Sequence, residues 1–362
     1  MKYQFHLLIV AGLGLAMACH GDSVSDPTMG SQEGPGRLRA DNRAGLTVMS
    51  RNMYIGANVD AVIAALVSPD PNDDFPTLLN AISTLQETDF PTRARAIANE
   101  IARNRPHAVG LQEVSDLDLD LTGFGVPFVL SLHFLPILQA ELANHGLQYV
   151  VAGEVTNTEA TPLPGISLID HDVLLVDASR VTLGALKVER NFANNIGVVA
   201  PGVDLKSGWV AVDATVNGST IIIASTHLVS GSSPGLDQLR AAQAIELAGS
   251  LGSAAPAIIM GDLNDVPGTP MYMVLQRAGF TDTWAALAPG ERGLTCCHLA
   301  NLANETATFD QRIDYIFARG FGAHGQVNRI GFTRPERIPG PFHSIWPSDH
   351  AGVVASLAVS LP

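Results

Sequence analysis

The chain has 362 residues, of which 46% are hydrophobic and 15% are charged. This composition is that of a globular protein with a sizeable core, and it excludes an intrinsically disordered chain. The formal net charge of −14 excludes a protein that holds polyanions by bulk electrostatics. It does not exclude a nuclease, because a bound cation and a few basic side chains can reverse the potential inside one cleft.

The first 18 residues have the features of a secretory signal peptide. Lys2 precedes an apolar stretch over residues 5–18, which is too short to span a bilayer and ends in small residues. The residues before Cys19 resemble a bacterial lipoprotein signal, although Ala16 stands where that signal prefers a branched aliphatic residue. We therefore expect export, with a lipid on Cys19 as a membrane anchor. The alternative is a plain signal peptide cut near Ala18.

Residues 19–44 are predicted to form a flexible tether, because they are rich in Gly, Ser, Pro and Asp and lack apolar periodicity. Residues 45–362 are then one folded domain. Apolar patterns in its first part predict a strand at 46–50, two helical segments within 60–90, a helix at 92–104, a strand at 108–111 and a helix at 137–144. Residues 116–136 lack a clear period and are predicted to be a surface excursion close to Glu113.

The second part of the domain is rich in predicted strands. They lie at 148–152, 173–177, 181–189, 198–200, 209–216, 220–225, 257–260, 313–318 and 352–360, with helices at 236–248 and 270–278. Helices followed by buried strands, together with a meander of strands, indicate an α/β fold.

Polar residues follow two of these strands. Asp262 and Asn264 occupy alternate positions after the 257–260 strand, so their side chains can point to one water or phosphate. His227 ends the 220–225 strand in the same way. Taken singly, each is explained by a turn or by a structural histidine. Together, the strands of one core could bring them to a single crevice.

Asp314 and His350 form the second predicted group. Strand alternation places Asp314 on the face opposite Tyr315, and a carboxylate buried there needs a partner. His350 is the candidate, because a buried Asp would fix its tautomer and raise its basicity. Asp349 and Glu113 then remain as hard oxygen ligands for a magnesium-like cation.

Cys296 and Cys297 are neighbours in the sequence. Adjacent Cα atoms lie about 3.8 Å apart across a trans peptide, below the usual disulfide range, so two free thiols are favoured over a bridge. A tetrahedral zinc site is not expected, because the chain has only three cysteines and no second pair.

Six signatures together resemble the endonuclease/exonuclease/phosphatase superfamily, in which they occur in this order. They are Asn52, Leu111-Gln112-Glu113, Thr226-His227-Leu228, Gly261-Asp262-Leu263-Asn264, Arg312-Ile313-Asp314-Tyr315 and Ser348-Asp349-His350. The resemblance covers roughly residues 46–361. The superfamily includes deoxyribonuclease I, abasic-site endonucleases, inositol polyphosphate 5-phosphatases and bacterial neutral sphingomyelinases.

The resemblance implies a fold, a cofactor and a role for each residue. The fold is a four-layer α/β sandwich of two packed mixed β-sheets flanked by helices. The cofactor is Mg²⁺, with Mn²⁺ or Ca²⁺ as alternatives. The implied metal site is Asn52, Glu113 and Asp349, and the implied catalytic residues are His227, Asp262, Asn264, Asp314 and His350. Asp262 would activate water, Asn264 would hold the water or phosphate, and the His350–Asp314 couple would grip phosphate beside His227.

The expected function is that of an exported, monomeric, divalent-metal-dependent phosphodiesterase that uses direct water attack, and a nuclease is favoured. Basic residues that could line a nuclease cleft are Arg51, Lys187, Arg190, Lys206 and Arg312. The first alternative is a sphingomyelinase-like lipid phosphodiesterase, with Phe342, Ile345 and Trp346 as an apolar lip, although loop packing of these three side chains is favoured. The second alternative is an inactive surface lipoprotein that only binds a ligand.

Overall fold

The computed structural model describes residues 45–70, 72–253 and 256–359. The predicted signal peptide and tether lie outside these residues. Among the described helices, none is long and apolar enough to cross a membrane.

The larger sheet has nine strands. They are β1 (Gly45–Asn52), β2 (Ala108–Asp120), β3 (Val129–His133), β4 (Tyr149–Leu163), β5 (Ile166–Asp177), β7 (Gly197–Ala200), β8 (Val203–Leu205), β14 (Phe321–Ile330) and β17 (Gly352–Val359). Their order is β14-β17-β1-β2-β5-β4-β8-β7, with β3 paired to the outer half of β2.

The smaller sheet has six strands in the order β12-β13-β11-β10-β9-β6. They are β6 (Thr182–Asn191), β9 (Gly208–Val216), β10 (Ser219–His227), β11 (Ala257–Asp262), β12 (Thr281–Asp282) and β13 (Asp314–Arg319). A separate two-stranded ribbon pairs β15 (Ile338–Pro339) with β16 (Ser344–Ile345).

Seven α-helices are described. They are α1 (Val59–Val67), α2 (Asp74–Thr88), α3 (Phe90–Asn104), α4 (Phe134–Asn144), α5 (Pro234–Ser250), α6 (Pro270–Arg277) and α7 (Thr283–Leu287). Prolines after residue 67 and at the start of α2, α3, α5 and α6 agree with the preference of proline for helix boundaries.

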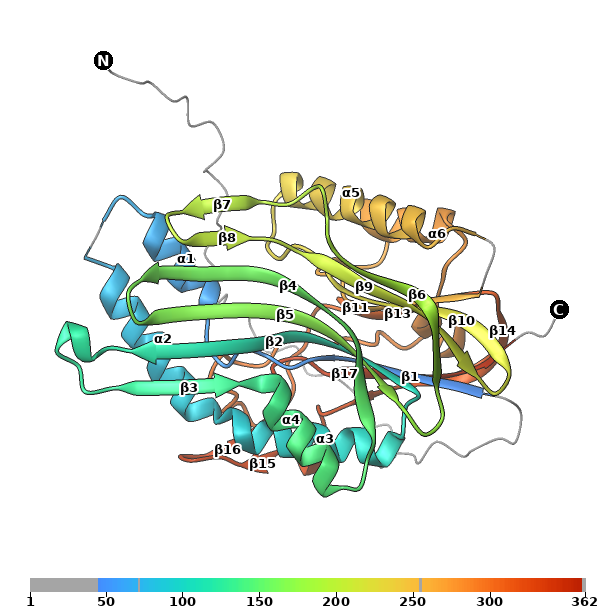
Figure 1. Ribbon diagram of the computed structural model, residues 1–362, viewed down its shortest axis with the longest axis horizontal. Coiled ribbons are helices and arrows are strands. Elements are labelled where there is room, and N and C mark those ends of the chain that lie inside the picture. The colour runs from blue at the N-terminus through green and yellow to red at the C-terminus, as the bar shows by residue number, and fades with distance from the viewer. Residues whose placement is uncertain (1–44, 71, 254–255, 360–362) are drawn as a thin grey trace, which may run out of the picture.

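Three apolar cores divide the domain into four layers, as Figure 1 shows. One core joins α1 to α4 with the larger sheet, a second lies between the two sheets, and a third joins α5 and α6 with the smaller sheet. Alternation sorts the side chains: in β13, Ile316 faces the other sheet, whereas Tyr315 and Phe317 face the helices. The predicted four-layer sandwich of two mixed sheets is confirmed.

Each sheet contains one parallel strand pair near its centre. These pairs are β1–β2 in the larger sheet and β10–β11 in the smaller sheet, and the other ladders are antiparallel. The carboxyl ends of parallel strands meet at one edge of a sheet. Because the two sheets pack face to face, the ends of both pairs can meet between the layers.

The predicted surface excursion at residues 116–136 is wrong. β2 continues to Asp120 and pairs with both β3 and β5. Leu117 and Leu119 are buried, and they alternate with acidic residues along the strand. This is the period-two pattern of a strand with one covered face. The aspartates at the alternate positions made the segment look like a loop in the sequence.

Gly110, on β2 of the larger sheet, lies against Ser225 and Met260 of the smaller sheet. A Cβ atom there would lie 2.6 Å from Ser225 Oγ and 3.0 Å from Met260 Cγ, and both neighbours are fully buried. We predict that Gly110→Ala lowers the free energy of unfolding by about 1–3 kcal/mol, measured by denaturant titration, because the sheets must separate. Gly123→Ala is the control, since no atom lies within 4 Å of its added Cβ. Equal effects of the two substitutions would contradict this packing argument.

Candidate active site

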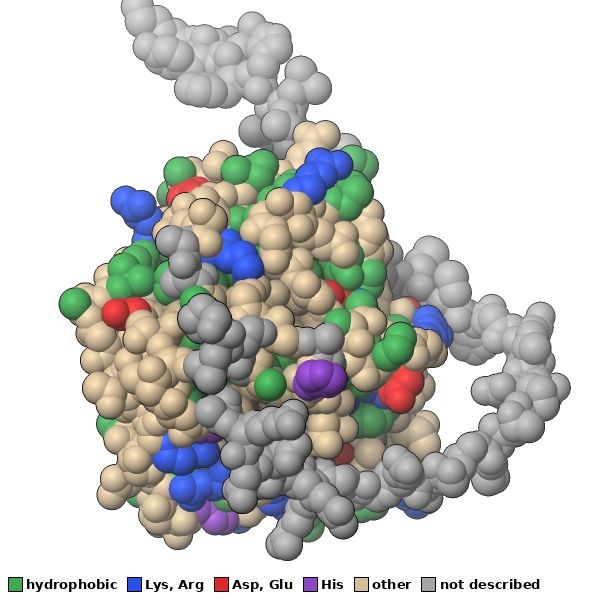
Figure 2. Space-filling model, turned by 90° about the vertical axis from the view of Figure 1, so that its right-hand side faces the viewer, with side chains coloured by type: hydrophobic (Ala, Val, Ile, Leu, Met, Phe, Trp, Pro, Cys, Tyr) green, Lys and Arg blue, Asp and Glu red, His purple; other side chains and the backbone are tan. Residues whose placement is uncertain are grey.

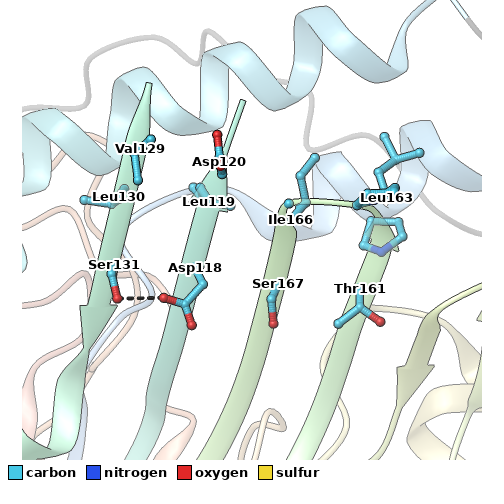
Figure 3. A pocket seen from close by; sticks show the side chains of 13 residues that line it. Asp118, Leu119, Asp120, Val129, Leu130, Ser131, Thr161, Leu163, Ile166 and Ser167 are labelled. Atoms are coloured by element: carbon cyan, nitrogen blue, oxygen red, sulfur yellow. Dashed lines mark hydrogen bonds between the residues drawn. The ribbon is translucent and has the colours of Figure 1, made fainter. Parts of the chain in front are cut away.

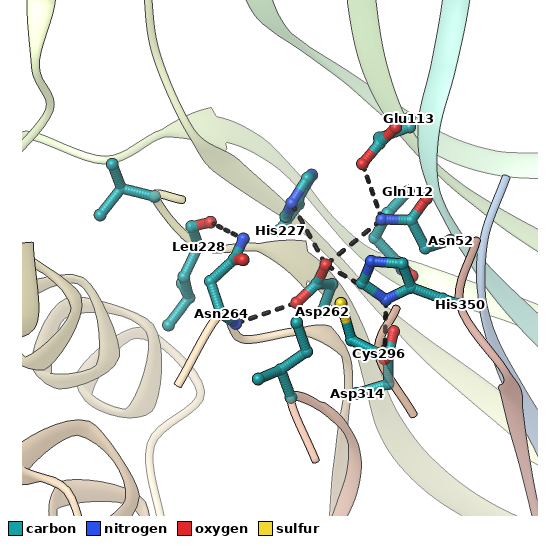
Figure 4. A network of polar contacts seen from close by, with 12 residues as sticks. Asn52, Gln112, Glu113, His227, Leu228, Asp262, Asn264, Cys296, Asp314 and His350 are labelled. Atoms are coloured by element: carbon teal, nitrogen blue, oxygen red, sulfur yellow. Dashed lines mark hydrogen bonds and ion pairs between the residues drawn. The ribbon is translucent and has the colours of Figure 1, made fainter. Parts of the chain in front are cut away.

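The ends of strands from both sheets converge between the layers (Figure 4). Asn52 and His227 end β1 and β10, Asp262 ends β11 and stands opposite His227 in the register, and Asp314 begins β13 opposite Asp262. Glu113 lies at an irregularity within β2, and His350 precedes β17. Segments far apart in the sequence therefore supply one group of side chains.

The Asp262 carboxylate is the centre of this group. Its Oδ2 atom lies 3.2 Å from Asn52 Nδ2, 3.6 Å from His227 Nε2 and 3.7 Å from His350 Nδ1. Its Oδ1 atom accepts the backbone N–H of Asn264 at 2.9 Å. Burial raises the pKa of Asp262, and Asp314 raises it further, whereas His350 and His227 lower it. Two hydrogen bonds, from Asn52 and from the N–H of Asn264, thus orient the carboxylate, and two imidazoles stand at ion-pair distance from it.

Asn52 bridges two carboxylates. Its Nδ2 donates to Glu113 Oε1 at 2.8 Å and to Asp262 Oδ2, and its Oδ1 accepts the N–H of Tyr54 at 2.8 Å. A backbone N–H can only donate, so this contact fixes which end of the amide faces the carboxylates. In this arrangement Asn52 orients Glu113 and Asp262. Its predicted place in the metal site stays a prediction.

Glu113 and Asp349 are the carboxylates best placed to hold a cation. Glu113 has a left-handed backbone with φ 55°, and the N–H of Ile55 donates to its Oε2 at 2.8 Å. Asp349 Oδ1 lies 4.0 Å from His350 Nε2 and accepts only a long contact from Ser348 Oγ at 3.4 Å. Burial raises the pKa of Asp349 to about 7, with Glu113 adding to the increase. Two oxygen donors with uncompensated negative charge fit a hard divalent cation.

His350 and Asp314 form a close buried pair. His350 Nδ1 lies 2.9 Å from Asp314 Oδ2. The backbone on both sides is fixed, because Asp314 N–H donates to Thr295 Oγ1 at 3.2 Å and the Arg51 guanidinium donates to the carbonyl of His350 at 2.5 Å. Burial alone lowers the pKa of His350, but the carboxylates, Asp314 foremost, raise it well above its ordinary value of 6.5. The Nε2 atom remains to face a ligand.

His227 stands in a second acidic environment, which the sequence analysis missed. Burial lowers its pKa, but Asp262 and Asp172, with smaller contributions from other carboxylates, raise it to about 9. Asp172 is fully buried on β5, and neither of its carboxylate oxygens has a hydrogen-bond partner among the described residues. Burial raises the pKa of Asp172 to about 7 and that of its neighbour Asp170 to about 8.

Backbone geometry after β11 presents Asn264. Its φ is 52°, and its Nδ2 donates to the carbonyl of Leu228 at 2.9 Å, which leaves the amide oxygen to accept from a ligand. Position 261, directly before Asp262, requires glycine, because a Cβ there would lie 1.8 Å from the carbonyl oxygen of Thr226. Tyr54, Glu113 and Asn264 are three of the seven non-glycine residues with positive φ in the described chain. Such strain is concentrated at functional sites.

Two buried arginines hold the loops around the site instead of lining it. Arg93 donates to the carbonyls of Met53, at 2.5 Å, and Tyr54, at 2.9 Å. Arg51 is fully buried and pairs with Glu100 at 3.0 Å. The expectation that Arg51 faces a nuclease cleft is wrong, and so is that for Arg312, which is buried against Asp282 at 2.7 Å. A buried cation needs a carboxylate or carbonyl partner. These arginines have such partners, and none of the three is among the residues that line the cleft, so they are not available to a substrate.

Cys296 and Cys297 also border the site. The structure joins them as a disulfide, so the favoured expectation of two free thiols is not met. Cys297 Sγ lies 3.7 Å from His350 Nε2. In Figure 4 the sulfur of Cys296 points toward the hollow beside His350 and Asp262.

Many of these groups line one cleft of about 380 Å³. Its walls include Glu113, His227, Asp262, Asn264, Asp349 and His350. A wider depression of about 680 Å³ lies at the outer ends of β2 to β5 (Figure 3). In this depression the Ser131 hydroxyl donates to Asp118 Oδ1 at 2.6 Å. No histidine is among the residues that line it. The chemistry therefore points to the smaller cleft.

Comparison with known proteins agrees with this site. The family model described as Endonuclease/Exonuclease/phosphatase family matches residues 84–350. The chain belongs to this family. Its members are metal-dependent phosphoester hydrolases, which makes this chain an enzyme of that class. A search of curated proteins returned no match.

Solved structures of family proteins share the fold. A protein of the family from Beutenbergia cavernae DSM 12333 is 21% identical with a TM-score of 0.57, and the alignment covers 88% of this chain and 72% of that one. A family protein from Bacteroides thetaiotaomicron is 15% identical with a TM-score of 0.51, covering 88% and 96%. The human Nocturnin catalytic domain with bound sulfate is 18% identical with a TM-score of 0.50, covering 89% and 97%. At these identities the likeness shows the fold alone.

The Asp314 contact makes a testable prediction about pH. In metal-free protein, Asp314→Asn removes the largest charge that raises the pKa of His350, so we predict a lower His350 pKa by NMR titration. Because the pKa of His350 is higher in the folded than in the unfolded protein, protonation of His350 stabilises the fold. This stabilisation is complete below about pH 6.5 and is lost as the pH rises through the pKa of the folded protein. The variant should therefore lose stability most at acid pH. His107, whose pKa burial lowers to about 4, should titrate unchanged. An unchanged His350 pKa would contradict the pairing.

Proposed function

We propose that this protein is an exported, divalent-metal-dependent phosphodiesterase that hydrolyses nucleotide phosphodiesters by direct attack of water. One observation carries the proposal: the Asp262 carboxylate, two imidazoles and the Glu113 and Asp349 carboxylates face one cleft. Water activation, phosphate binding and cation binding are the requirements of metal-assisted phosphoester hydrolysis.

Each side chain has a role that its contacts support. Asp262 is the base that orients and deprotonates the attacking water, and Asn264 offers its amide oxygen to the same water. His350 presents Nε2 to a non-bridging phosphate oxygen, while Asp314 holds Nδ1. Glu113 and Asp349 would hold Mg²⁺ or a similar ion, which would neutralise charge developing on the phosphate.

His227 supplies positive charge on the other side of the cleft. Its pKa of about 9 keeps the imidazole protonated at neutral pH in the metal-free protein. An imidazolium there attracts a phosphodiester, and its proton is available to the leaving oxygen. Asp172 lies behind it and sustains this charge. The two histidines thus act as the cations that recognise the scissile phosphate.

The walls around the phosphate position favour a nucleotide over an acyl chain. Asn157, Thr158 and Ser207 line the cleft, and the buried Oδ1 of Asn157 has no hydrogen-bond partner among the described residues. An unpaired acceptor is costly to bury, so it suits a substrate donor such as a sugar hydroxyl or a base amine. A diacylglycerol phospholipid carries no such donor beside its phosphodiester, whereas a sphingolipid carries a hydroxyl and an amide N–H.

The charge around the cleft favours a short substrate over a long duplex. Lys206 is the one Lys or Arg among the lining residues described, and Asp204 and Glu159 pair with it at 2.7 and 3.3 Å. Figure 2 shows one face of the molecule, on which Lys and Arg side chains lie in separate small groups. Long polynucleotides are held by rows of phosphate contacts, which a single paired lysine in the cleft lining does not provide. We propose recognition of one or a few nucleotides around the scissile bond.

Export and anchoring are part of the proposal. Support comes from the charged start, the apolar stretch over residues 5–18 and the small residues before Cys19. We propose that a lipid on Cys19 tethers a monomeric catalytic domain at the cell envelope, where a tether over residues 19–44 lets it reach substrate.

A lipid phosphodiesterase is the second candidate. The three-residue apolar lip that would favour it is incomplete, because Ile345 and Trp346 are fully buried. Phe342, however, is 73% exposed in the β15–β16 ribbon, and Leu299 is 58% exposed in the neighbouring loop. His343 and Asn301 O join these two segments at 3.2 Å. Two exposed apolar side chains keep this candidate, because the Leu299 loop also contributes His298 and Ala300 to the cleft lining.

Activity on a generic bis-aryl phosphodiester tests catalysis. With Mg²⁺, we predict that Asp262→Ala lowers kcat by about 10²–10⁴-fold, because the base is lost while binding groups remain. Glu113→Gln should raise the Mg²⁺ concentration needed for half activity. Asp120→Asn, at the distant depression, is the matched control and should leave both parameters unchanged. A wild type inactive with every divalent metal would favour the ligand-binding alternative instead.

Parallel assays separate the substrate classes. We predict that short DNA or RNA oligonucleotides are cleaved with a higher kcat/KM than sphingomyelin vesicles, because Asn157, Thr158 and Ser207 are among the residues that line the cleft. Phe342→Ser should then leave oligonucleotide cleavage unchanged. Faster cleavage of vesicles, lost in Phe342→Ser, would instead establish the lipid candidate.

A further inference from the structure

Cys296 and Cys297 have no part in the proposed reaction, yet they are held against its phosphate-binding histidine. Cys297 Sγ lies 3.7 Å from His350 Nε2. Both sulfur atoms and a nitrogen of His350 lie within 4.8 Å of one another. Cys296 is buried, and both cysteines line the active-site cleft.

The segment that carries the cysteines is fixed to both halves of the site. Thr295 Oγ1 accepts the N–H of Asp314, and the carbonyl of Thr295 accepts the N–H of Ala351 at 2.8 Å. On the other side, the N–H of His298 donates to the carbonyl of Asp349 at 2.8 Å. These contacts hold the residues on both sides of the cysteine pair against Asp314, Asp349 and Ala351.

The distance between Cys297 Sγ and His350 Nε2 matches a soft-metal site. With metal–sulfur bonds of about 2.3 Å and metal–nitrogen bonds of about 2.05 Å, tetrahedral ligands lie about 3.6 Å apart. The 3.7 Å separation of Cys297 Sγ and His350 Nε2 is close to this value. Because Asp314 occupies Nδ1, His350 has Nε2 to offer. The imidazole adds a third ligand to the two sulfur atoms, which leaves one tetrahedral position open.

We propose that the reduced Cys296–Cys297 pair and His350 Nε2 form a binding site for one thiophilic cation, and that its occupation switches the enzyme off. The inference rests on the proposed function through the role of His350. A cation on Nε2 takes the atom that would contact phosphate. The site differs from the Glu113–Asp349 site in chemistry, because thiolates select soft cations and carboxylates select hard ones.

Reduction must precede binding. The disulfide accepts two electrons and two protons from an external reductant and gives two thiols. With a phosphine and water, the phosphorus is oxidised to the phosphine oxide as the S–S bond breaks. Binding of the cation then releases the two thiol protons. The oxidised enzyme is consequently the form that resists soft cations.

Cadmium titration of the purified full chain tests this inference. Phosphine-reduced protein in excess Mg²⁺ receives Cd²⁺ in steps, while thiolate-to-cadmium absorption in the near ultraviolet and phosphodiesterase activity are both recorded. We expect a thiolate band that saturates at one Cd²⁺ per chain, with loss of most activity over the same range. Unreduced protein should show neither change.

Two variants separate this site from displacement of Mg²⁺. Cys296→Ser/Cys297→Ser should keep its basal activity, lose the band and resist the same Cd²⁺ concentrations. His350→Gln should keep the band but need more Cd²⁺ to reach it, and this readout does not require activity. Cys297→Ala gives a single-site version in case the double variant misfolds, and it should bind Cd²⁺ more weakly than wild type.

Two results would overturn the inference: the absence of a thiolate band in reduced wild-type protein, or equal inhibition of the wild type and the double serine variant. The second result would mean that Cd²⁺ acts at the oxygen ligands. If no substrate is turned over, the proposed function fails while the band titration still decides the metal site.

Discussion

A carboxylate buried between two sheets must be surrounded by donors, and the Asp262 carboxylate imposes this requirement on the rest of the site. Asn52, His227 and His350 approach one of its oxygens, and the N–H of Asn264 approaches the other. These groups come from both sheets. They meet because the parallel pairs β1–β2 and β10–β11 both end at the active site. The layered core thus determines the geometry on which catalysis depends.

The same region holds more negative than positive charge. Glu113, Asp349, Asp170 and Asp172 add to Asp262, while the nearby arginines are committed to framework carbonyls and to Glu100. Burial and mutual repulsion raise the pKa values of Asp349, Asp170 and Asp172 to between about 7 and about 8. Such a cluster is relieved by a bound cation, which links the electrostatics of this chain to the metal dependence of its family.

Much of the fold and the placement of the polar residues could be predicted from strand ends. Asp262, His227 and Asp314 follow or begin apolar runs, and their strands place them together. Asp172 was missed because the predicted strand began at the apolar Val173, directly after it, whereas β5 already begins at Ile166. The orientation of Asn52 and the burial of Arg51 depend on partners far along the chain, Glu113 and Glu100, which no local pattern specifies.

Anomalous diffraction from crystals soaked with Mn²⁺ and a non-hydrolysable phosphodiester tests the central claim most directly. The account predicts a manganese peak within coordination distance of the Glu113 and Asp349 carboxylates, with phosphate oxygens beside His350 Nε2 and His227. A manganese peak elsewhere, or a phosphodiester bound away from these histidines, would contradict it.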